Sequence, residues 1–556
     1  MTKDPAPMSQ TVGHQIAEAL ADAGITTIFG VISIHNMPIL DAVAEQGRIR
    51  FIPARGEAGA MNMADAFSRV SGSLGVALTS TGTAAGNAAG AQAEALTAGS
   101  RVLHITTQID RPYMDRDRAA IHDVPKQPEM LKGVSKQVFR IWDEMGVLGT
   151  LAAAIRAAST PPTGPVSLEI PVDVQRVPAM PGQKLAPPAP ALPPVDTTAI
   201  EALADRIKTA NRPMLWLGGG ARGAEDQALA LVERGFGAVT STQGRAVVPE
   251  AHKGTLGAFN MTPEAEAIYK SADLMIVVGS RLRGNETRNN RMPLPRPLFQ
   301  IDVDPTQAGR NYNVDGFLCG DAAETLAALA KALPDSLETD PQWHYDIAVA
   351  RAKSEGALRS RLGPYQVVAD HLLAAVPAGN HPWVRDVTIS NSTFGNRYVQ
   401  IAAPHLGVHA LGGGIGQGVA MAIGAAAAST ARTVALIGDG GTQLGLAELI
   451  TAVDEALPIT FVLMNDAAYG VIENIQDAQY DGRRHYSKLK TPDFGLLCQA
   501  VDLPHHKVTR IEDFPATFDT AMSGPGPALV EVDMIAIGPF AEAFAGPPAG
   551  AAGSAS

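Results

Sequence analysis

GDGGTQLGLAELITAVDEALPITFVLMND, residues 438–466, places an acidic residue directly after each of two apolar runs. Asp439 follows TVALIG and Asp466 follows ITFVLMN, while leucine, isoleucine and valine recur at helical spacing between them. A strand, a helix and a second parallel strand bring the two strand ends side by side. The stretch therefore predicts a parallel α/β unit with two carboxylates at one edge of its sheet.

Two carboxylates at one edge repel each other unless a cation joins them. Mg²⁺ takes oxygen ligands of this kind and keeps open positions for phosphate oxygens. Gly438, Gly440 and Gly441 permit close backbone approach, and the N–H groups of the following helix face an anion. The residues alone leave two interpretations open. One is a metal-bridged diphosphate, and the other is a helix-capping Asp439 with a turn-forming Asp466.

Short apolar runs alternate with helical patterns along all 556 residues. Continuous apolar strands separated by helices are typical of parallel sheets covered on both faces. We therefore expect an α/β fold with three doubly wound parallel-sheet domains, which bind ligands beyond the carboxyl ends of their strands. The expected division is a first domain over 8–176, a Pro-rich linker over 177–196, a central domain over 197–335, a second linker over 336–365, a third domain over 366–540 and a flexible tail over 541–556.

The composition excludes several classes of partner. A net charge of −12 argues against nucleic acid and anionic membranes. The first ten residues lack the apolar core of a signal peptide, and the Gly/Ala-rich stretch 411–429 reads as a packed helix after a loop rather than a membrane span. Cys319 and Cys498 fit a reducing compartment and form no metal motif. We expect a cytoplasmic protein that acts on a small-molecule substrate.

The Gly-Asp-Gly of residues 438–440, followed at this spacing by Asn465 and Asp466, resembles the cofactor motif of the thiamine-diphosphate (ThDP) enzyme family. The resemblance is to its acetolactate synthase-like and pyruvate decarboxylase-like branch, including benzaldehyde lyase-type carboligases. It covers nearly the whole chain, in the order pyrimidine-binding, central and diphosphate-binding domains. It implies ThDP and Mg²⁺ as cofactors, with Asp439, Asp466 and the main-chain carbonyl of Ala468 as metal ligands.

One metal ligand departs from the family pattern. The family usually has Asn where this chain has Asp466, so a second negative charge faces the diphosphate here, and the metal preference is in question. The main-chain ligand at Ala468 does not depend on a side chain. The resemblance also implies cofactor contacts from residues around the motif, which are Gly438, Gly440, Gly441, Tyr469 and Gly470.

Glu57 follows an expected strand and opens an expected helix. A Glu in a first helical turn can simply complement the helix dipole. The resemblance instead assigns it to N1′ of the aminopyrimidine, a role that needs a carboxyl group in a dry pocket. The family often has His before this Glu, and Gly56 stands there. The resemblance adds cofactor contacts from a second Gly-rich loop and its helix, at Thr81, Gly82 and Asn87.

Ile415 lies in the Gly-rich segment 412–416. It matches the aliphatic residue that wedges between the two cofactor rings in the family, and Gly413 belongs to the same loop. Plain core packing is the alternative. Three further residues match positions near the substrate in parts of the family: His35, His122 and Glu473. For each of these three, a surface or structural role is the alternative.

A competing motif lies in the central block. Gly218, Gly220 and Gly223 form a G-x-G-x-x-G after an apolar run, but no acid ends the next expected strand, as a nicotinamide site would require. In the family the central domain binds FAD, binds ADP or is empty. The stretch from residue 277 begins like the FAD-binding pattern and then departs from it, so we expect no functional FAD.

The resemblance implies ThDP- and Mg²⁺-dependent cleavage or formation of carbon–carbon bonds. The reaction would be a decarboxylation, carboligation or lyase reaction on small 2-oxo acids or 2-hydroxy ketones, with acetolactate synthase-like chemistry as one candidate. A homodimer or homotetramer is implied, in which Glu57 of one chain serves the metal site of its neighbour. Two alternatives are an NAD(P)-dependent oxidoreductase that uses the loop at 218–223 and a catalytically silent regulatory subunit of the ThDP family.

Overall fold

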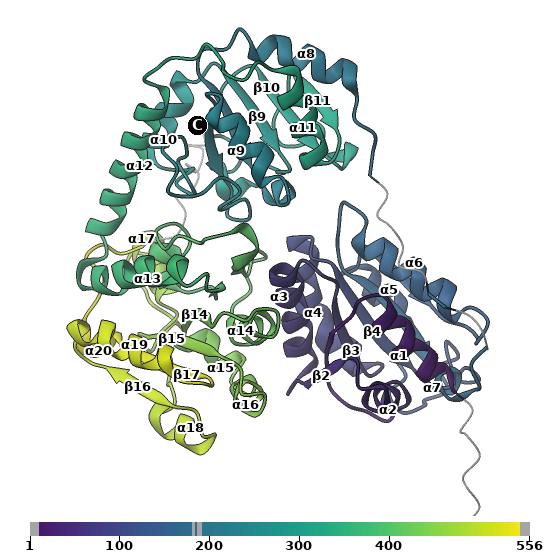
Figure 1. Cartoon of the computed structure of the whole chain (residues 1–556). Helices are drawn as coiled ribbons and strands as arrows, with labels where there is room; N and C mark the ends of the chain where they lie inside the picture. The colour runs from purple at the N-terminus through teal and green to yellow at the C-terminus, as the bar shows by residue number, and fades with distance from the viewer. Residues whose placement is uncertain (1–9, 181–183, 186–191, 545–556) are drawn as a thin grey trace, which may run out of the picture.

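The computed structural model describes residues 10–180, 184–185 and 192–544, which fold into three α/β domains (Figure 1). Each domain holds one parallel sheet flanked by helices. The expected fold class is therefore confirmed. Parts of the Pro-rich linker and most of the expected tail lie outside the described residues.

The first domain contains a six-stranded sheet with the order β2-β1-β3-β4-β6-β5. All its strand pairs are parallel, and its strands β1, β3, β4 and β6 are fully buried. Its elements are α1 (Val12–Asp22), β1 (Thr27–Gly30), α2 (Met37–Gln46), β2 (Arg50–Pro53), α3 (Glu57–Ser71), β3 (Gly75–Thr79), α4 (Thr83–Ala98), β4 (Val102–Gln108), α5 (Gln127–Lys132), β5 (Gln137–Arg140), α6 (Val147–Ser159), β6 (Val166–Pro171) and α7 (Val172–Arg176).

The central domain has five strands in the order β11-β10-β9-β7-β8. Its first strand, β7, therefore lies between its second and third strands, β8 and β9. Its elements are α8 (Thr197–Ile207), β7 (Pro213–Leu217), α9 (Glu225–Glu233), β8 (Gly237–Thr240), α10 (Pro263–Ser271), β9 (Leu274–Val278), β10 (Leu298–Asp302), β11 (Gly316–Cys319), α11 (Ala322–Ala332) and α12 (Trp343–Ser360).

The third domain repeats the topology of the first, with the order β13-β12-β14-β15-β17-β16. Strands β14 and β15 are buried along their whole length in the middle of the sheet. Its elements are α13 (Gln366–Ala378), β12 (Trp383–Arg385), β13 (Gly407–His409), α14 (Gly418–Ala427), β14 (Thr433–Gly438), α15 (Asp439–Leu444), α16 (Glu448–Asp454), β15 (Ile459–Asn465), α17 (Gly470–Gln479), α18 (Phe494–Ala500), β16 (His505–Val508), α19 (Phe514–Ser523), β17 (Ala528–Asp533) and α20 (Met534–Ile537).

The segment expected as a second linker, 336–365, is largely helical. Helix α12 occupies most of it and buries Trp343 and Ile347 in the core of the central domain. The indole of Trp343 donates a 3.1 Å hydrogen bond to the carbonyl of Pro213. The central domain thus extends into this segment before the chain enters the third domain.

The first and third domains pack through α3 and α14, which lie side by side in Figure 1. Gly424 of α14 faces the backbone of Met63, and a Cβ at Gly424 would clash with it. The two helices share one hydrophobic cluster with β14 and β15. Small residues on α14 therefore let the two domains approach closely. Helix α14 spans only ten residues, and no helix within the described residues is long and apolar enough to cross a membrane.

Candidate functional site

Asp439 and Asp466 lie at the ends of the paired strands β14 and β15. Asp439 is buried, and Asp466 is partly buried beside it. Burial, and then the charge of Asp439, raise the pKa of Asp466 to about 8, and burial also raises the pKa of Asp439. Within the described residues, Oδ2 of Asp439 is buried without a hydrogen-bond partner. An unpaired buried carboxylate oxygen beside a second carboxylate fits a bound cation.

Ala468, the expected main-chain ligand, lies next to this pair. Its amide donates a 3.3 Å hydrogen bond to Oδ1 of Asp466. The amides of Leu489 and Tyr469 bond the carbonyls of Ala467 and Ser487 at 2.9 and 2.8 Å, which holds the segment in place. No cluster of three or more His, Cys, Asp or Glu side chains suited to a metal occurs in the described part of the chain. A cation here would therefore need main-chain and ligand oxygens besides the two carboxylates.

Three of the expected cofactor-binding glycines, Gly440, Gly441 and Gly470, lie where a side chain has no room. A Cβ at Gly440 would lie 2.6 Å from the ring of Tyr469, and a Cβ at Gly441 would lie 2.5 Å from the carboxylate of Asp386. A Cβ at Gly470 would clash with the carboxylate of Asp466. Gly438 directly precedes α15 as its N-cap residue. The backbone beside the two acids is thus closely packed.

Asp386, which the sequence analysis missed, organises the loop that carries Ile415. It follows β12, and both its carboxylate oxygens accept the amide of Gly416 at 3.1 Å. Burial raises the pKa of Asp386 to about 6, against the opposing effect of hydrogen bonds from backbone amides that include Gly416 and Gln417. Gly413 and Gly416 have left-handed φ values of 80° and 83°. Ile415 itself is 38% exposed on this chain, which leaves its side chain available to a ligand or a neighbouring subunit.

Glu57 is the first residue of α3, as expected. Asn87 of the neighbouring helix α4 donates a 3.1 Å hydrogen bond from Nδ2 to Oε2 of Glu57. The structure therefore brings together two residues that the sequence analysis assigned to the cofactor. Glu57 is half-buried on this chain, so its carboxylate has an open side.

Thr81 and Gly82 belong to a buried polar network in the first domain. Oγ1 of Thr81 donates to Oε1 of Gln108 at 2.9 Å, and the amide of Gly82 donates to Oε1 of Gln127 at 2.6 Å. Nε2 of Gln127 donates to Oε1 of Glu169 at 2.6 Å. Gly82 has a φ of 64°, and a Cβ there would clash with the carbonyl of His122. The loop is therefore held rigidly between β4 and α5.

His35 and His122 contact each other edge to face, with ring centroids 5.2 Å apart. Nδ1 of His35 lies 3.4 Å from Oγ of Ser80, beside the Thr81 loop. Burial, and then the charge of His122, lower the pKa of His35. A neutral, buried imidazole is suited to accepting a proton. The two histidines that the sequence analysis named separately thus form one pair.

Glu473 lies on α17, which has no buried residues. Its carboxylate bonds Arg484 at 3.1 Å and the hydroxyl of Ser487 at 3.2 Å. These contacts tie α17 to the segment that follows it. A catalytic role for Glu473 stays a prediction.

The expected site residues form two groups on one chain. The first domain holds the group of Glu57 and Asn87, and the third domain holds the group of Asp439 and Asp466. Among the residues that the structure describes, no hydrogen bond or ion pair joins the two groups.

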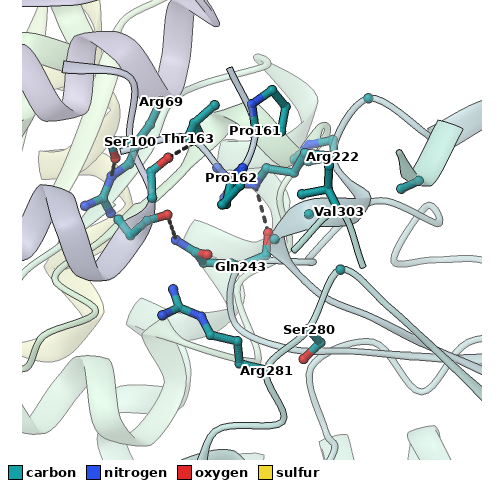
Figure 2. Close-up of a pocket in the computed structure, with 18 of the residues that line it drawn as sticks. Arg69, Ser100, Pro161, Pro162, Thr163, Arg222, Gln243, Ser280, Arg281 and Val303 are labelled. Carbon is teal, nitrogen blue, oxygen red and sulfur yellow. Dashed lines mark hydrogen bonds between the residues drawn. The ribbon is translucent and has the colours of Figure 1, made fainter. Parts of the chain in front are cut away.

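A cavity of about 790 Å³ opens between the central and first domains (Figure 2). It lies beyond the carboxyl ends of the central strands, at the Gly-rich turn after β7, and Pro161 to Thr163 of the first domain line its other side. Six basic and five acidic side chains line the cavity. The basic side chains can bind the phosphate groups of a ligand. The basic residues are Arg69, Arg101, Lys136, Arg222, Arg281 and Arg283.

The G-x-G-x-x-G at 218–223 borders this cavity but differs from a nicotinamide site. Its turn leads into a 3₁₀ helix over Gly219–Ala221, and no acid ends β8. The strand order, with the first strand between the second and the third, also differs from the order typical of nicotinamide-binding domains. A nicotinamide function therefore has no support beyond the glycine spacing.

Three stretches match the descriptions of one enzyme family. Residues 10–130 match "Thiamine pyrophosphate enzyme, N-terminal TPP binding domain". Residues 200–329 match the central domain of the same family, and residues 388–532 match its C-terminal TPP binding domain. The three matches fall in the three domains of the structure, in the expected order.

Curated relatives cover nearly the whole chain. A probable 2-ketoarginine decarboxylase from Pseudomonas aeruginosa is 27% identical over 532 residues, which cover 94% of each chain. An acetolactate synthase large subunit from Parasynechococcus marenigrum is 27% identical over 559 residues, which cover 95% of this chain and 88% of the relative. The acetolactate synthase isozyme 3 large subunit of Escherichia coli is 26% identical over 533 residues, which cover 90% and 91%.

Proposed function

Because the chain belongs to the thiamine pyrophosphate enzyme family, we propose that it cleaves or forms carbon–carbon bonds in small 2-oxo acids or 2-hydroxy ketones. The reaction would require ThDP and Mg²⁺. Support comes from the buried Asp439 and the partly buried Asp466 at adjacent strand ends, with an unpaired oxygen on Asp439. This pair is the observation that carries the proposal, because it suits a cation that would bind the cofactor diphosphate.

ThDP, when bound, supplies a nucleophilic carbon that adds to a substrate carbonyl. Asp439, Asp466 and the main chain at Ala468 would hold Mg²⁺ and, through it, the diphosphate. Glu57 would hold a proton against N1′ of the pyrimidine, with Asn87 orienting its carboxylate. Residues of the third domain would contact the cofactor through their backbone in this arrangement, and they are Gly413, Gly438, Gly440, Gly441, Tyr469 and Gly470. From the first domain, Thr81 and Gly82 would contact it.

His35 and His122 are the candidates for moving protons on the substrate. They form one pair beside the Thr81 loop, and the lowered pKa of His35 keeps it neutral near pH 7. A neutral His35 can accept a proton from a hydroxyl group or return one to a carbonyl oxygen. Glu473 is a weaker candidate, because Arg484 and Ser487 occupy its carboxylate.

We propose a homodimer or homotetramer in which Glu57 of one chain serves Asp439 of its neighbour. The family resemblance, which assigns Glu57 and Asp439 to one cofactor site shared by two chains, supports this assembly. The exposure of Ile415 supports it as well, since an aliphatic side chain at the cofactor would be covered by the cofactor and the neighbouring chain.

The central cavity bears on whether a nucleotide accompanies ThDP. Its six basic side chains could bind the phosphates of ADP or FAD, but the sequence after Ser280 departs from the FAD-binding pattern. We propose that the cavity holds no FAD and that ADP is the better candidate for its ligand. The visible absorbance of the purified protein tests for flavin, and titration with ADP tests for the nucleotide.

The defining experiment reconstitutes the protein with ThDP and Mg²⁺ and offers it a panel of 2-oxo acids and 2-hydroxy ketones. Pyruvate and 2-ketoarginine belong to the panel because of the relatives' names. Release of CO₂ from an oxo acid would indicate a decarboxylase or synthase, and the carbon count of the product would separate these two. Release of an aldehyde without CO₂ would indicate a lyase. Absence of ThDP binding would contradict the proposal.

The alternative of a silent regulatory subunit has its own test. A Glu57→Gln variant that binds ThDP and keeps every activity of the wild type would favour it. Loss of activity with ThDP binding retained would favour the enzyme. Binding of NAD(H) without binding of ThDP would favour the oxidoreductase alternative.

A further inference from the structure

The turn that leads into Glu57 is held by a side chain from another domain. The carboxylate of Glu448, the first residue of α16, accepts the amides of Arg55 and Gly56. The distances from Oε1 are 3.1 Å to both amides. The N-cap residue of α3 is Gly56, which has no side chain to provide a cap. An acceptor from outside α3 therefore satisfies the backbone donors just before its first turn.

Glu448 is well suited to hold this turn. It is buried, and Oγ1 of Thr451 donates to its Oε2 at 2.8 Å. Burial raises the pKa of Glu448, against the opposing effect of hydrogen bonds from Thr451, Arg55 and Gly56. A Cβ at position 59 would clash with the Glu448 carboxylate, so the glycine at this position leaves room for the carboxylate to pack against α3. Gly59 of α3 and the acid of α16 thus match each other in shape.

The same turn carries weaker contacts at the surface. The Arg55 side chain forms an ion pair with Asp454 at the end of α16, and Arg50 pairs with Glu455 at 2.5 Å. Asp454 is about half exposed, so this pair contributes little to stability. Unlike these surface ion pairs, the hydrogen bonds of Glu448 are buried and reach the main chain next to Glu57.

We propose that Glu448 is a positioning residue for Glu57, because its carboxylate binds the two amides that precede Glu57 and thereby fixes the main chain from which Glu57 reaches the cofactor. The inference rests on the proposed function, in which Glu57 binds the cofactor pyrimidine. Glu57 is then held from two sides. Glu448 fixes its backbone, and Asn87 orients its carboxylate with a 3.1 Å hydrogen bond.

Three variants separate positioning from packing. Glu448→Gln keeps an oxygen acceptor for both amides and a side chain of the same shape. Glu448→Ala removes the acceptor. Asp454→Ala is the matched control, since it removes a carboxylate that contacts Arg55 only through the side chain. Each variant is compared with the wild type by hydrogen exchange of the peptide over residues 50–58 without cofactor, by ThDP affinity in the presence of Mg²⁺, and by kcat and KM.

Glu448→Ala should speed exchange of this peptide and lower kcat about 10- to 100-fold, because a small displacement of a reacting group has an effect of that size. Its KM for the substrate should change little. Glu448→Gln should restore exchange and kcat to within about 3-fold of the wild type, and Asp454→Ala should match the wild type. If Glu448→Ala does not fold, Glu448→Asp, which withdraws the carboxylate by one methylene, takes its place with the same expectations.

Two results would overturn the inference. One is a Glu448→Ala or Glu448→Asp variant with faster exchange and a lower melting temperature but with wild-type kcat, which would reveal a packing role only. The other is a Glu448→Gln variant as slow as Glu448→Ala, which would show that hydrogen bonding to the turn is not what matters. If the proposed function itself were wrong, the results would differ from both of these. The wild type would then not bind ThDP, or Glu57→Gln would keep full activity.

Discussion

Asp439 and Asp466 follow two adjacent parallel strands and interact electrostatically, and the pKa of Asp466 rises to about 8. Burial is the larger cause, and the charge of Asp439 follows. Without a cation, two neighbouring acids that are wholly or partly buried destabilise the fold when both are charged. This repulsion explains why a metal would be needed at the two acids.

Asp466→Asn should stabilise the metal-free protein, because the amide removes the repulsion and keeps an oxygen toward the site. We expect the melting temperature in EDTA at pH 8 to rise by about 2–4 °C, the shift that ~1 kcal/mol produces in a domain of this size. Mg²⁺ should stabilise the wild type and not Asp439→Ala. Asp519→Asn, at an exposed carboxylate of the same domain, is the control. A melting temperature that falls in Asp466→Asn would contradict the repulsion.

Mixed oligomers test whether active sites combine two chains. Glu57→Gln and Asp439→Asn should each be inactive alone. Unfolded together in equal amounts and refolded, they should regain about a quarter of the wild-type activity, because half of randomly formed dimers are mixed and each has one intact site. Measuring activity against the mixing ratio provides the check. If each site lay within one chain, no mixture would regain activity.

His35→Ala should slow the reaction while leaving the cofactor bound. A positioned general base contributes about 100-fold or more, so kcat should fall by at least that factor. The affinity for ThDP should stay within about 3-fold, since the contacts of His35 are with Ser80, His122 and Gln175 and not with Glu57 or Asp439. His371→Ala is the control, at a histidine that pairs with Asp519 in the third domain. Equal kcat values for His35→Ala and the wild type would exclude a role for His35 in proton transfer.

His104 should make the stability of the first domain fall in acid. Burial lowers its pKa to about 3, and its ring bonds Thr79 at 2.9 Å and Gln92 at 2.8 Å. The unfolded chain takes up a proton at His104 below about pH 6.5 and the folded chain does not, so stability is lost as the pH falls from 6.5 toward 3. Between pH 6.5 and 5.5 this loss is about 1 kcal/mol.

Urea unfolding of the wild type and of His104→Gln at these two pH values measures the effect. The variant keeps hydrogen-bonding groups toward Thr79 and Gln92 and has no proton to gain. Its free energy of unfolding should therefore fall by about 1 kcal/mol less than that of the wild type. Identical losses in both proteins would show that His104 does not resist protonation in the fold.

Much of the site could be predicted from short-range pattern. Asp439, Asp466 and Glu57 follow apolar strands, and side chains at strand ends of parallel sheets meet at one edge. The family resemblance then assigned roles to residues such as Asn87, which the structure places against Glu57. The pairing of His35 with His122 was not predicted, because a loop 87 positions away supplies the second ring.

Periodicity was enough to establish three parallel α/β domains, and the strand-end acids predicted a candidate metal site, since these features depend on neighbours a few positions apart. The roles of Asp386 and Glu448 depended on the fold. Glu448 reaches the amide of Gly56 across 392 positions, and Asp386 binds a loop amide 30 positions away. A carboxylate in a helix or after a strand looks like any polar residue in sequence. Its partner is set by how α16 packs against α3, and this packing is the sum of many contacts between domains.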